Sequence, residues 1–431
     1  MSILIAIFGI MAVGFIIDMP IGLAIFIASL YGVVTSGIPL ELVANNLANS
    51  LNSFTLLAIP LFILAGQIMT KGSMAEKLVN FCLIFVGRFK SSLAIAAIVA
   101  STFFAALSGS GQATTAAIGG ALVPKMKEQG YPAGLAAALV ACAGVVGPII
   151  PPSVTMVLFG VQTGASVGKM FMGGIIPGIL MSGSLLVVLA IYMNFMDGKN
   201  RIVPLVTKKQ TLKEKLLIVW DAKWALMMPV IILGSIYGGI ATPTEAAVIA
   251  VVYSIVVGLF IERDMTVEDV MIAFKGGIST KGTIMLLVVA AFILGSVVTV
   301  NQIPVIVSNA ITSITTNKIV IMLLINLVLL FLGMIMETMG AMLISTPILM
   351  PLALQCGLTP ITYGVVCCMN LALGYCTPPV GISTFIASAI ADAPISEMFK
   401  YLMLFTAALM IVVLACSFFP GIIEIIPNMM Q

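Results

Sequence analysis

The sequence predicts an all-α integral membrane protein, built as an inverted repeat with two re-entrant helical hairpins and two discontinuous transmembrane helices. Three observations lead to this prediction: the composition, the length of the apolar runs and an internal repeat. Of the 431 residues, 61% are hydrophobic and only 8% are charged, a balance typical of proteins that fold in lipid. The apolar runs lack the period-two alternation of membrane strands, so they are expected to cross as helices.

The repeat relates the segment from Phe104 to Pro152 to the segment from Phe331 to Pro379, at an offset of 227 residues. Five Gly or Pro positions coincide without a gap, far more than chance would give. Each copy contains an apolar run, a short polar tip, a second apolar run and an apolar helix interrupted by Gly-x-x-x-Pro-Pro. Paired helix breakers in two halves of an apolar chain are typical of the binding site of a transporter.

The elements are expected in the same order in both halves. The predicted units are a first repeat over 1–195, a basic cytoplasmic linker over 196–223 and a second repeat over 224–431. Uninterrupted crossing helices are predicted near 2–17, 20–37, 54–70, 170–195, 224–240, 243–261, 281–301 and 399–419.

Two pairs of shorter apolar runs are the predicted hairpins. Each arm has about 15 residues, fewer than the roughly 20 that a crossing helix needs, so each pair is expected to enter and leave on one side. A broken helix follows each hairpin, and a helix lying along the membrane plane leads into it. The hairpins are expected at 88–127 and 318–355, the broken helices at 132–163 and 361–391, and the in-plane helices at 74–90 and 303–317.

The Lys and Arg residues predict the orientation. Five crossings per half invert the second half relative to the first. Basic residues flank the first hairpin and fill the linker, which places both in the cytoplasm by the positive-inside rule. The loop from Gly37 to Ser53 has no Lys or Arg and is expected in the periplasm. Lys318, at the entry of the second hairpin, is the one cation that does not fit this orientation. Both termini are then predicted to be periplasmic.

Several classes of function are disfavoured. The chain has no His, its seven cysteines lack metal-ligand spacing, and a net charge of +3 does not suggest binding to nucleic acid. It also lacks the Gly-x-x-x-x-Gly-Lys-Ser/Thr motif that binds ATP. Nucleotide hydrolysis by this chain is therefore not expected.

The helix breaks predict cation sites. A break inside the bilayer frees backbone carbonyls that cannot stay unpaired in hydrocarbon. Around the first break these carbonyls can face the hydroxyls of the hairpin tip, a set of neutral oxygens that suits Na⁺. The repeat predicts a second, similar site, hence two or more Na⁺ ions. The predicted ligands are Ser108, Gln112, Thr115, Gly147, Pro148, Ile149, Gly340, Gly374, Cys376 and Thr377.

An anionic substrate is expected between the two tips and the two breaks. The amino ends of the half-helices supply positive dipoles there, and no Lys or Arg lies in these segments to pair with a carboxylate. Glu337 is the acidic residue deep in a hairpin, where it could ligate a cation, carry a proton or hydrogen-bond to its neighbours. In the alternative interpretation, the Gly and Ser residues of these segments bind no ligand and only allow close helix packing. The predicted substrate-binding residues are Ser110, Ser153, Thr155, Glu337 and Thr338.

Four motifs resemble the large permease subunit of the tripartite ATP-independent periplasmic (TRAP) transporters, and the resemblance covers essentially the whole chain. It implies an elevator-type transporter that takes up an organic acid with Na⁺ across the bacterial inner membrane. It also implies two partners, a periplasmic substrate-binding protein and a small membrane subunit of four helices. The motifs are Gly239-Ile-Ala-Thr-Pro-Thr-Glu-Ala-Ala247, Ser108-Gly-Ser-Gly-Gln-Ala-Thr-Thr115, Gly147-Pro-Ile-Ile-Pro-Pro152 and Gly333-Met-Ile-Met-Glu337.

Two other functions stay open at this point. A stand-alone dicarboxylate/Na⁺ symporter, or an ion antiporter of the related broken-helix architecture, would work without a binding protein. An intramembrane hydrolase would need a nucleophile with a base, and the chain has neither His nor a paired intramembrane Asp. Sialic acids, C4-dicarboxylates, keto acids and sugar acids are all compatible with a site lined by helix dipoles.

Overall fold

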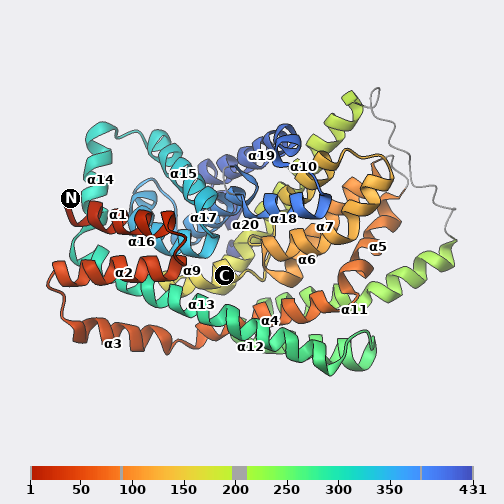
Figure 1. The fold of residues 1–431 in the computed structure, drawn as a ribbon, viewed down its shortest axis with the longest axis horizontal. Coiled ribbons are helices and arrows are strands. Elements are labelled where there is room, and N and C mark those ends of the chain that lie inside the picture. The colour runs from red at the N-terminus through yellow and green to blue at the C-terminus, as the bar shows by residue number, and fades with distance from the viewer. Residues whose placement is uncertain (1, 88–90, 197–210, 379–380, 430–431) are drawn as a thin grey trace.

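The computed structural model describes residues 2–87, 91–196, 211–378 and 381–429. Within these ranges every regular element is a helix, which confirms the all-α prediction. Eight of the described helices are long and apolar enough to cross a membrane. Figure 1 shows most helices running along the long axis of the molecule, while α5 (Met74–Val86) and α14 (Ile303–Ile314) run across that direction at opposite ends.

The first half of the chain ends with a hairpin, a broken helix and a long helix. Its elements are α1 (Ser2–Ile16), α2 (Ile21–Thr35), α3 (Leu40–Leu51), the 3-10 turn η1 (Phe54–Leu57), α4 (Ala58–Lys71), α5, α6 (Ser92–Ser108), α7 (Gly111–Glu128), α8 (Ala133–Gly144), α9 (Val154–Thr163) and α10 (Val167–Met196).

The second half ends in the same way and adds a short final helix. Its elements are α11 (Leu212–Tyr237), α12 (Pro243–Val256), the π-helical turn η2 (Val257–Ile261), α13 (Val267–Val300), α14, α15 (Lys318–Ile335), α16 (Thr338–Gln355), α17 (Pro360–Leu373), the 3-10 turn η3 (Gly374–Cys376), α18 (Ile382–Ala391), α19 (Ile395–Phe418) and α20 (Gly421–Asn428).

The repeat seen in the sequence reappears in the helix boundaries. α7 begins at Gly111 and α16 at Thr338, which are 227 residues apart, and α8 and α17 begin with the same separation. Both predicted hairpins are present as pairs of helices joined by two-residue turns, and both broken helices are interrupted where the Gly-x-x-x-Pro-Pro segments begin. The hairpin arms have 17 or 18 residues, longer than predicted. Their re-entry from one side of the membrane remains a prediction.

Three predicted boundaries differ from the structure. The expected loop from Gly37 to Ser53 contains the amphipathic helix α3. The end of the expected linker is helical, because α11 begins at Leu212; residues 197–210 of that linker lie outside the described residues. α13 is one helix of 34 residues that begins well before the crossing predicted at 281–301, since it packs along both α2 and α4.

Local sequence explains why several helices begin where they do. The Thr242 side chain accepts a hydrogen bond from the Glu245 backbone, and the Glu245 carboxylate accepts one from Thr242 N–H at 2.8 Å. Thr266 and Asp269 form the same capping box at the start of α13. Such reciprocal caps satisfy backbone donors that have no partner within the helix.

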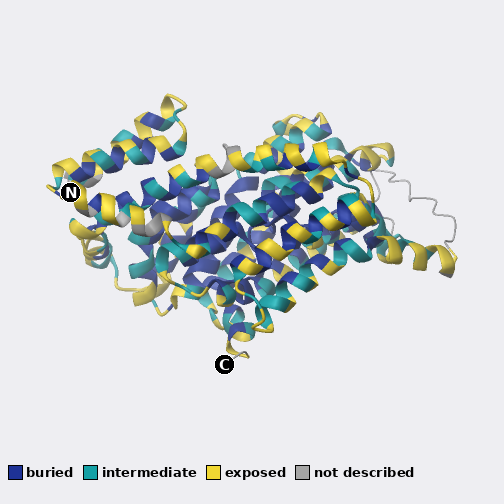
Figure 2. Ribbon diagram, turned by 90° about the horizontal axis from the view of Figure 1, so that it is seen from below, coloured by how far each residue is buried: buried dark blue, intermediate teal, exposed yellow. Residues whose placement is uncertain are grey.

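The two broken helices form the centre of the molecule. Every residue of α8 from Gly134 to Gly144 is buried, and so is every residue of α17 from Thr362 to Leu373. Figure 2 shows this buried interior surrounded by helices with exposed outer faces. The outer faces are apolar, with exposed Leu216, Trp220 and Val230 on α11, as expected for a surface in contact with lipid.

Candidate functional site

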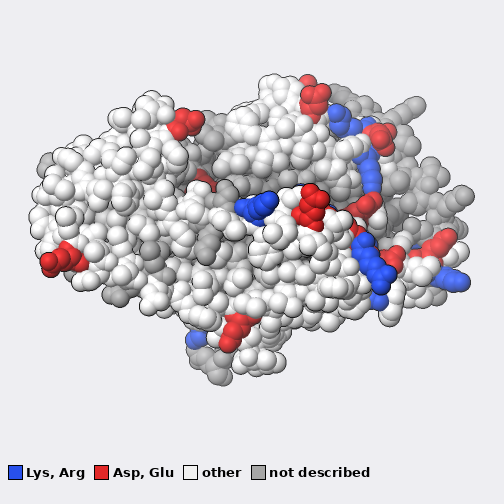
Figure 3. Space-filling model, turned by 60° about the horizontal axis from the view of Figure 1, so that its bottom comes forward, with Lys and Arg blue, Asp and Glu red and all other residues white. Residues whose placement is uncertain are grey.

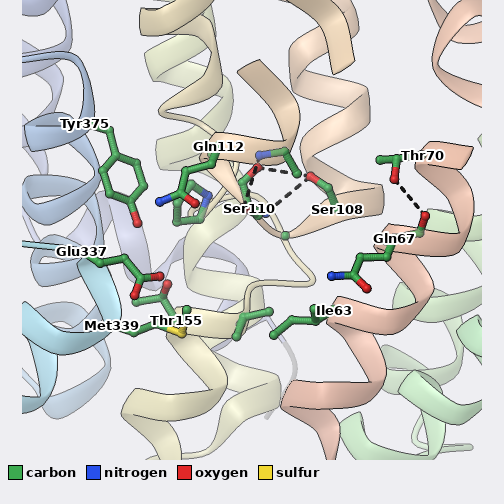
Figure 4. Close-up of a pocket in the computed structure, with 16 residues that line it drawn as sticks. Ile63, Gln67, Thr70, Ser108, Ser110, Gln112, Thr155, Glu337, Met339 and Tyr375 are labelled. Carbon is green, nitrogen blue, oxygen red and sulfur yellow. Dashed lines mark hydrogen bonds between the residues drawn. The ribbon is translucent and has the colours of Figure 1, made fainter. Parts of the chain in front are cut away.

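A cavity of about 270 Å³ lies where the two hairpin tips meet the first break. α4, the tip between α6 and α7, the start of α9 and the tip before α16 form its walls, and Tyr375 of the second break completes them (Figure 4). Six residues predicted from sequence line it: Ser108, Ser110, Gln112, Pro148, Thr155 and Glu337. The structure therefore brings together groups from both repeats.

The tip of the first hairpin is a compact network of hydrogen bonds. Gly109 turns the chain with a φ of 59°, and a Cβ there would lie 2.5 Å from the Pro152 carbonyl oxygen, so only glycine fits. The Ser110 hydroxyl caps α7 by accepting a hydrogen bond from the backbone of Ala113. The Thr114 hydroxyl donates to the Ser110 carbonyl oxygen at 2.8 Å. These contacts fix the carbonyls and hydroxyls of the tip before any ligand binds.

The first break packs directly on this tip. A Cβ on Gly147 would lie 2.6 Å from the Ser110 carbonyl oxygen, so the two backbones approach closely. One turn earlier, a Cβ on Gly144 would lie 2.0 Å from the Thr115 Oγ1. That hydroxyl is fully buried and has no hydrogen-bond partner among the residues that the structure describes. A buried polar group without a partner is costly, so Thr115 is well placed to ligate a small cation.

Two residues predicted at the first break have other neighbours. The Ser153 hydroxyl donates to the Pro148 carbonyl oxygen at 2.5 Å and accepts from Met156 N–H, so it caps α9 and does not line the cavity. The carbonyl oxygen of Ile149 lies against Gly174 of α10, away from the tip. Ser153 and Ile149 therefore stabilise the break from behind.

The second break packs against different residues from those that correspond to the neighbours of the first break. A Cβ on Gly374 would lie 2.3 Å from the Gly333 carbonyl oxygen, so this break packs on the arm α15 instead of on the tip. Gly340 faces Ile21 and Leu287 of α2 and α13, not the break. The second break reaches its tip through Tyr375, whose hydroxyl oxygen accepts a hydrogen bond from Thr338 N–H at 3.2 Å.

The side chains at the second break are mostly engaged locally. The Thr377 hydroxyl donates to the Leu373 carbonyl oxygen at 2.8 Å, and the Cys376 thiol lies 3.3 Å from the same oxygen. The Thr338 hydroxyl, by contrast, is fully buried and faces the Tyr375 hydroxyl, without a hydrogen bond of regular geometry among the described residues. Of the residues predicted here, Thr338 offers the freest oxygen.

Helix dipoles and one carboxylate set the electrostatics of the cavity. The first turns of α7, α9 and α16 all contribute lining residues, and the amino ends of helices favour anions. Glu337 lines the same cavity without a Lys or Arg among the lining residues. An anion bound here needs the dipoles together with bound cations.

The contribution of α4 to the cavity was not predicted from the sequence. Gln67 and Thr70 of this helix line the cavity, and the buried Gln67 Oε1 has no hydrogen-bond partner among the described residues. The signal was a Gln within an otherwise apolar run. Tyr375 was also missed, although it lies in the Gly-x-x-x-Pro-Pro segment itself.

Comparison with known proteins gives a consistent result. Residues 4–422 match the family described as "Tripartite ATP-independent periplasmic transporter, DctM component". The chain is 39% identical over 416 residues to the isethionate TRAP transporter permease protein DctMQ of Oleidesulfovibrio alaskensis, covering 96% of this chain and 65% of that one. It is 38% identical over 378 residues to the C4-dicarboxylate TRAP transporter large permease protein DctM of Pseudomonas aeruginosa, covering 87% of this chain and 86% of that one.

Two further matches are more distant. The sialic acid TRAP transporter large permease protein SiaM of Vibrio cholerae is 31% identical over 412 residues, covering 95% of each chain. The crystal structure of the Alcanivorax borkumensis YdaH transporter, described as having an unusual topology, superposes with a TM-score of 0.61 at 13% identity over 88% of each chain. At that identity the likeness concerns the fold alone.

Proposed function

Since this chain belongs to the DctM component family of the tripartite ATP-independent periplasmic transporters, we propose that it imports a small organic acid together with Na⁺ by an elevator movement. The family consists of transporters, not enzymes, and its members are large permease subunits that span the inner membrane several times. Uptake by this family uses a periplasmic substrate-binding protein. We propose a small membrane subunit of four helices as the second partner.

The single observation that supports this proposal most is the composition of the cavity. Its walls combine three helix amino ends with hydroxyl and amide side chains, and they contain no Lys or Arg. Dipoles and bound cations would then hold the carboxylate or sulfonate of the substrate. The cavity volume of about 270 Å³ lies below the roughly 300–1,000 Å³ typical of ligand pockets, which favours an acid of a few carbon atoms.

Na⁺ is proposed as the coupling ion because hydroxyl and carbonyl oxygens, which are neutral ligands, surround the cavity beside the Glu337 carboxylate. Among the described residues, the buried Thr115 hydroxyl beside the first break has no hydrogen-bond partner, and the buried Thr338 hydroxyl at the second tip faces the Tyr375 hydroxyl. Carbonyl oxygens of the first tip lie close to Thr115 and Gly147. A monovalent cation at each place would satisfy oxygens that are otherwise unpaired.

The orientation of the chain is proposed from its charges. Figure 3 shows most of the visible Lys and Arg side chains toward the end of the molecule where α5 and the start of α11 lie in Figure 1. Among the described residues, the opposite end shows none in that view. The positive-inside rule then favours a cytoplasmic position for the first end, with both termini in the periplasm.

The test is uptake by the purified chain reconstituted in vesicles with its small subunit and binding protein. Isethionate, succinate and N-acetylneuraminate serve as probes, each with a Na⁺ gradient and with a K⁺ gradient. We expect uptake of at least one acid that needs Na⁺, the small subunit and the binding protein together. Robust uptake of free acid by this chain alone would instead identify a stand-alone carrier, and uptake that is equal in K⁺ would refute the coupling to Na⁺.

A further inference from the structure

One side chain of the first broken helix is bonded to the backbone of the second hairpin. Gln162, near the end of α9, donates a hydrogen bond from Nε2 to the carbonyl oxygen of Leu343 in α16, at 2.8 Å. These residues are 181 positions apart and belong to different repeats. The other end of the same amide, Gln162 Oε1, is buried and has no hydrogen-bond partner in the described ranges. The Leu343 carbonyl is therefore the hydrogen-bond partner that orients this amide.

The Leu343 carbonyl is available because of a proline one turn later. In an α-helix the carbonyl of residue 343 would accept a hydrogen bond from the backbone N–H of residue 347. Residue 347 is Pro347, which lies inside α16 and has no N–H to donate. Gln162 supplies the missing donor from another helix. Pro347 and Gln162 thus act as a matched pair, in which one residue frees an acceptor and the other fills it.

The bond joins two helices that line the cavity. Thr155 lies seven residues, about two turns, before Gln162 on α9, so the two side chains project from the same face. Met339 lies four residues before Leu343 on α16, again on the same face. Figure 4 shows Thr155 beside Met339 and Glu337 at the cavity. The Gln162–Leu343 hydrogen bond therefore joins these two walls of the cavity at a point one to two turns away from it.

We propose that Gln162 is a positioning residue that ties the second hairpin to the first broken helix, so that the cavity walls from the two repeats keep their spacing and move as one unit. This inference rests on the proposed function only in treating the cavity as the substrate site. Its central prediction, that the second hairpin loosens when the bond is lost, concerns the protein without substrate.

The first experiment replaces the amide by an apolar group of similar length, Gln162→Met, in the assembled complex in lipid nanodiscs. Hydrogen–deuterium exchange should become about tenfold faster in the peptides covering 338–347 and 154–162, because the tie holds both helices closed. Exchange at the first hairpin tip, 105–116, should not change. Thr163→Val is the matched control, since the Thr163 hydroxyl makes only local hydrogen bonds: it donates to the Phe159 carbonyl oxygen at 2.8 Å and accepts from Ala165 N–H at 3.3 Å. Unchanged exchange in Gln162→Met would overturn the proposal.

The second experiment tests whether Gln162 positions the two helices or only supplies a hydrogen bond to the buried Leu343 carbonyl. Pro347→Ala restores a backbone N–H that can bond the Leu343 carbonyl within α16. If Gln162 only satisfies that carbonyl, the double variant Gln162→Met/Pro347→Ala should exchange like the wild-type protein. If Gln162 positions the helices, the double variant should regain its melting temperature while exchange at 338–347 stays fast. Recovery of both properties would overturn the proposal.

Uptake gives an independent readout. With whichever of isethionate, succinate or N-acetylneuraminate the wild-type complex imports, the double variant should raise KM about five- to twentyfold and change kcat less than about twofold. An unchanged KM would refute the positioning role. A wild-type complex that imports none of the three acids would count against the proposed substrate class, whereas the exchange experiments would still decide the role of Gln162.

Discussion

Replacing Thr115 by Val tests whether this residue is a cation ligand or a packing residue. The two roles predict different changes in the stability of the protein and in its dependence on Na⁺. The two side chains have nearly the same shape, so the substitution removes the hydroxyl and leaves the volume. The Thr115 hydroxyl is fully buried, has no hydrogen-bond partner within the described part of the chain and lies where a Cβ on Gly144 would stand. If it contacts only protein, its removal should raise the free energy of unfolding by about 1 kcal/mol or more, because an unsatisfied buried group is lost.

If the hydroxyl ligates Na⁺, the same substitution should weaken Na⁺ binding. A lost neutral ligand costs about 1–2 kcal/mol, which corresponds to a five- to thirtyfold higher Kd for Na⁺. At a Na⁺ concentration of about 100 times the wild-type Kd, bound Na⁺ stabilises the wild-type protein by about 2.7 kcal/mol. For a variant with a tenfold higher Kd the same relation gives about 1.4 kcal/mol. We therefore expect Thr115→Val to be at least as stable as wild type in K⁺ and to gain less stability from Na⁺.

The assay is a melting curve of the purified complex over a Na⁺ titration at constant ionic strength, with K⁺ replacing Na⁺. Ser92→Ala is the control, because Ser92 also has a fully buried hydroxyl without a hydrogen-bond partner in the described part of the chain but lies at the far end of the first hairpin arm. Its Na⁺ titration should match that of wild type. A Thr115→Val variant that keeps the wild-type Na⁺ titration while its stability in K⁺ rises would refute the ligand role, because the hydroxyl would then be a packing group.

Three further outcomes are expected. Gly147→Ala should reduce uptake at least about tenfold and lower the melting temperature, because its Cβ would lie 2.6 Å from the backbone of the hairpin tip; Gly120→Ala, with no atom within 4 Å, should change neither quantity. Glu337→Gln keeps the shape of the cavity wall and removes its charge. If the carboxylate takes part in coupling, uptake at saturating Na⁺ should fall about tenfold or more. Uptake at the wild-type rate would exclude that role. A single cysteine at Lys213 should react with thiol reagents only from the cytoplasmic side and one at Asn45 only from the periplasmic side; labelling of both from one side would contradict the inverted topology.

Much of the site followed from local chemistry. Gly147 and Pro148 together disfavour a continuous helix, because glycine adds flexibility and proline lacks a donor, so the position of the first break could be predicted from the sequence. Polar residues at a hairpin tip inside an apolar chain must find partners, which predicted Ser108 and Ser110 as site residues at the first tip and Glu337 as one at the second.

Other features depended on contacts between distant residues. The sequence alone could not show that the Ser110 hydroxyl caps its own helix while the Thr115 hydroxyl has no partner, because both are hydroxyls on the same hairpin. It also gave no reason to place Gln67 of α4 beside tips that follow it by tens or hundreds of residues.

The sequence by itself determined that the chain is helical, spans a membrane and repeats its hairpin and broken helix at an offset of 227 residues, because composition, helix breakers and period are local properties. Only the tertiary structure decided that the two halves are not equivalent. The first break packs on its tip, whereas Gly374 of the second break packs on Gly333 of the hairpin arm. The physical reason is steric. Two backbones approach closely only where the facing residues have small side chains or none, and the packing of helices far apart in the chain decides which residues face each other.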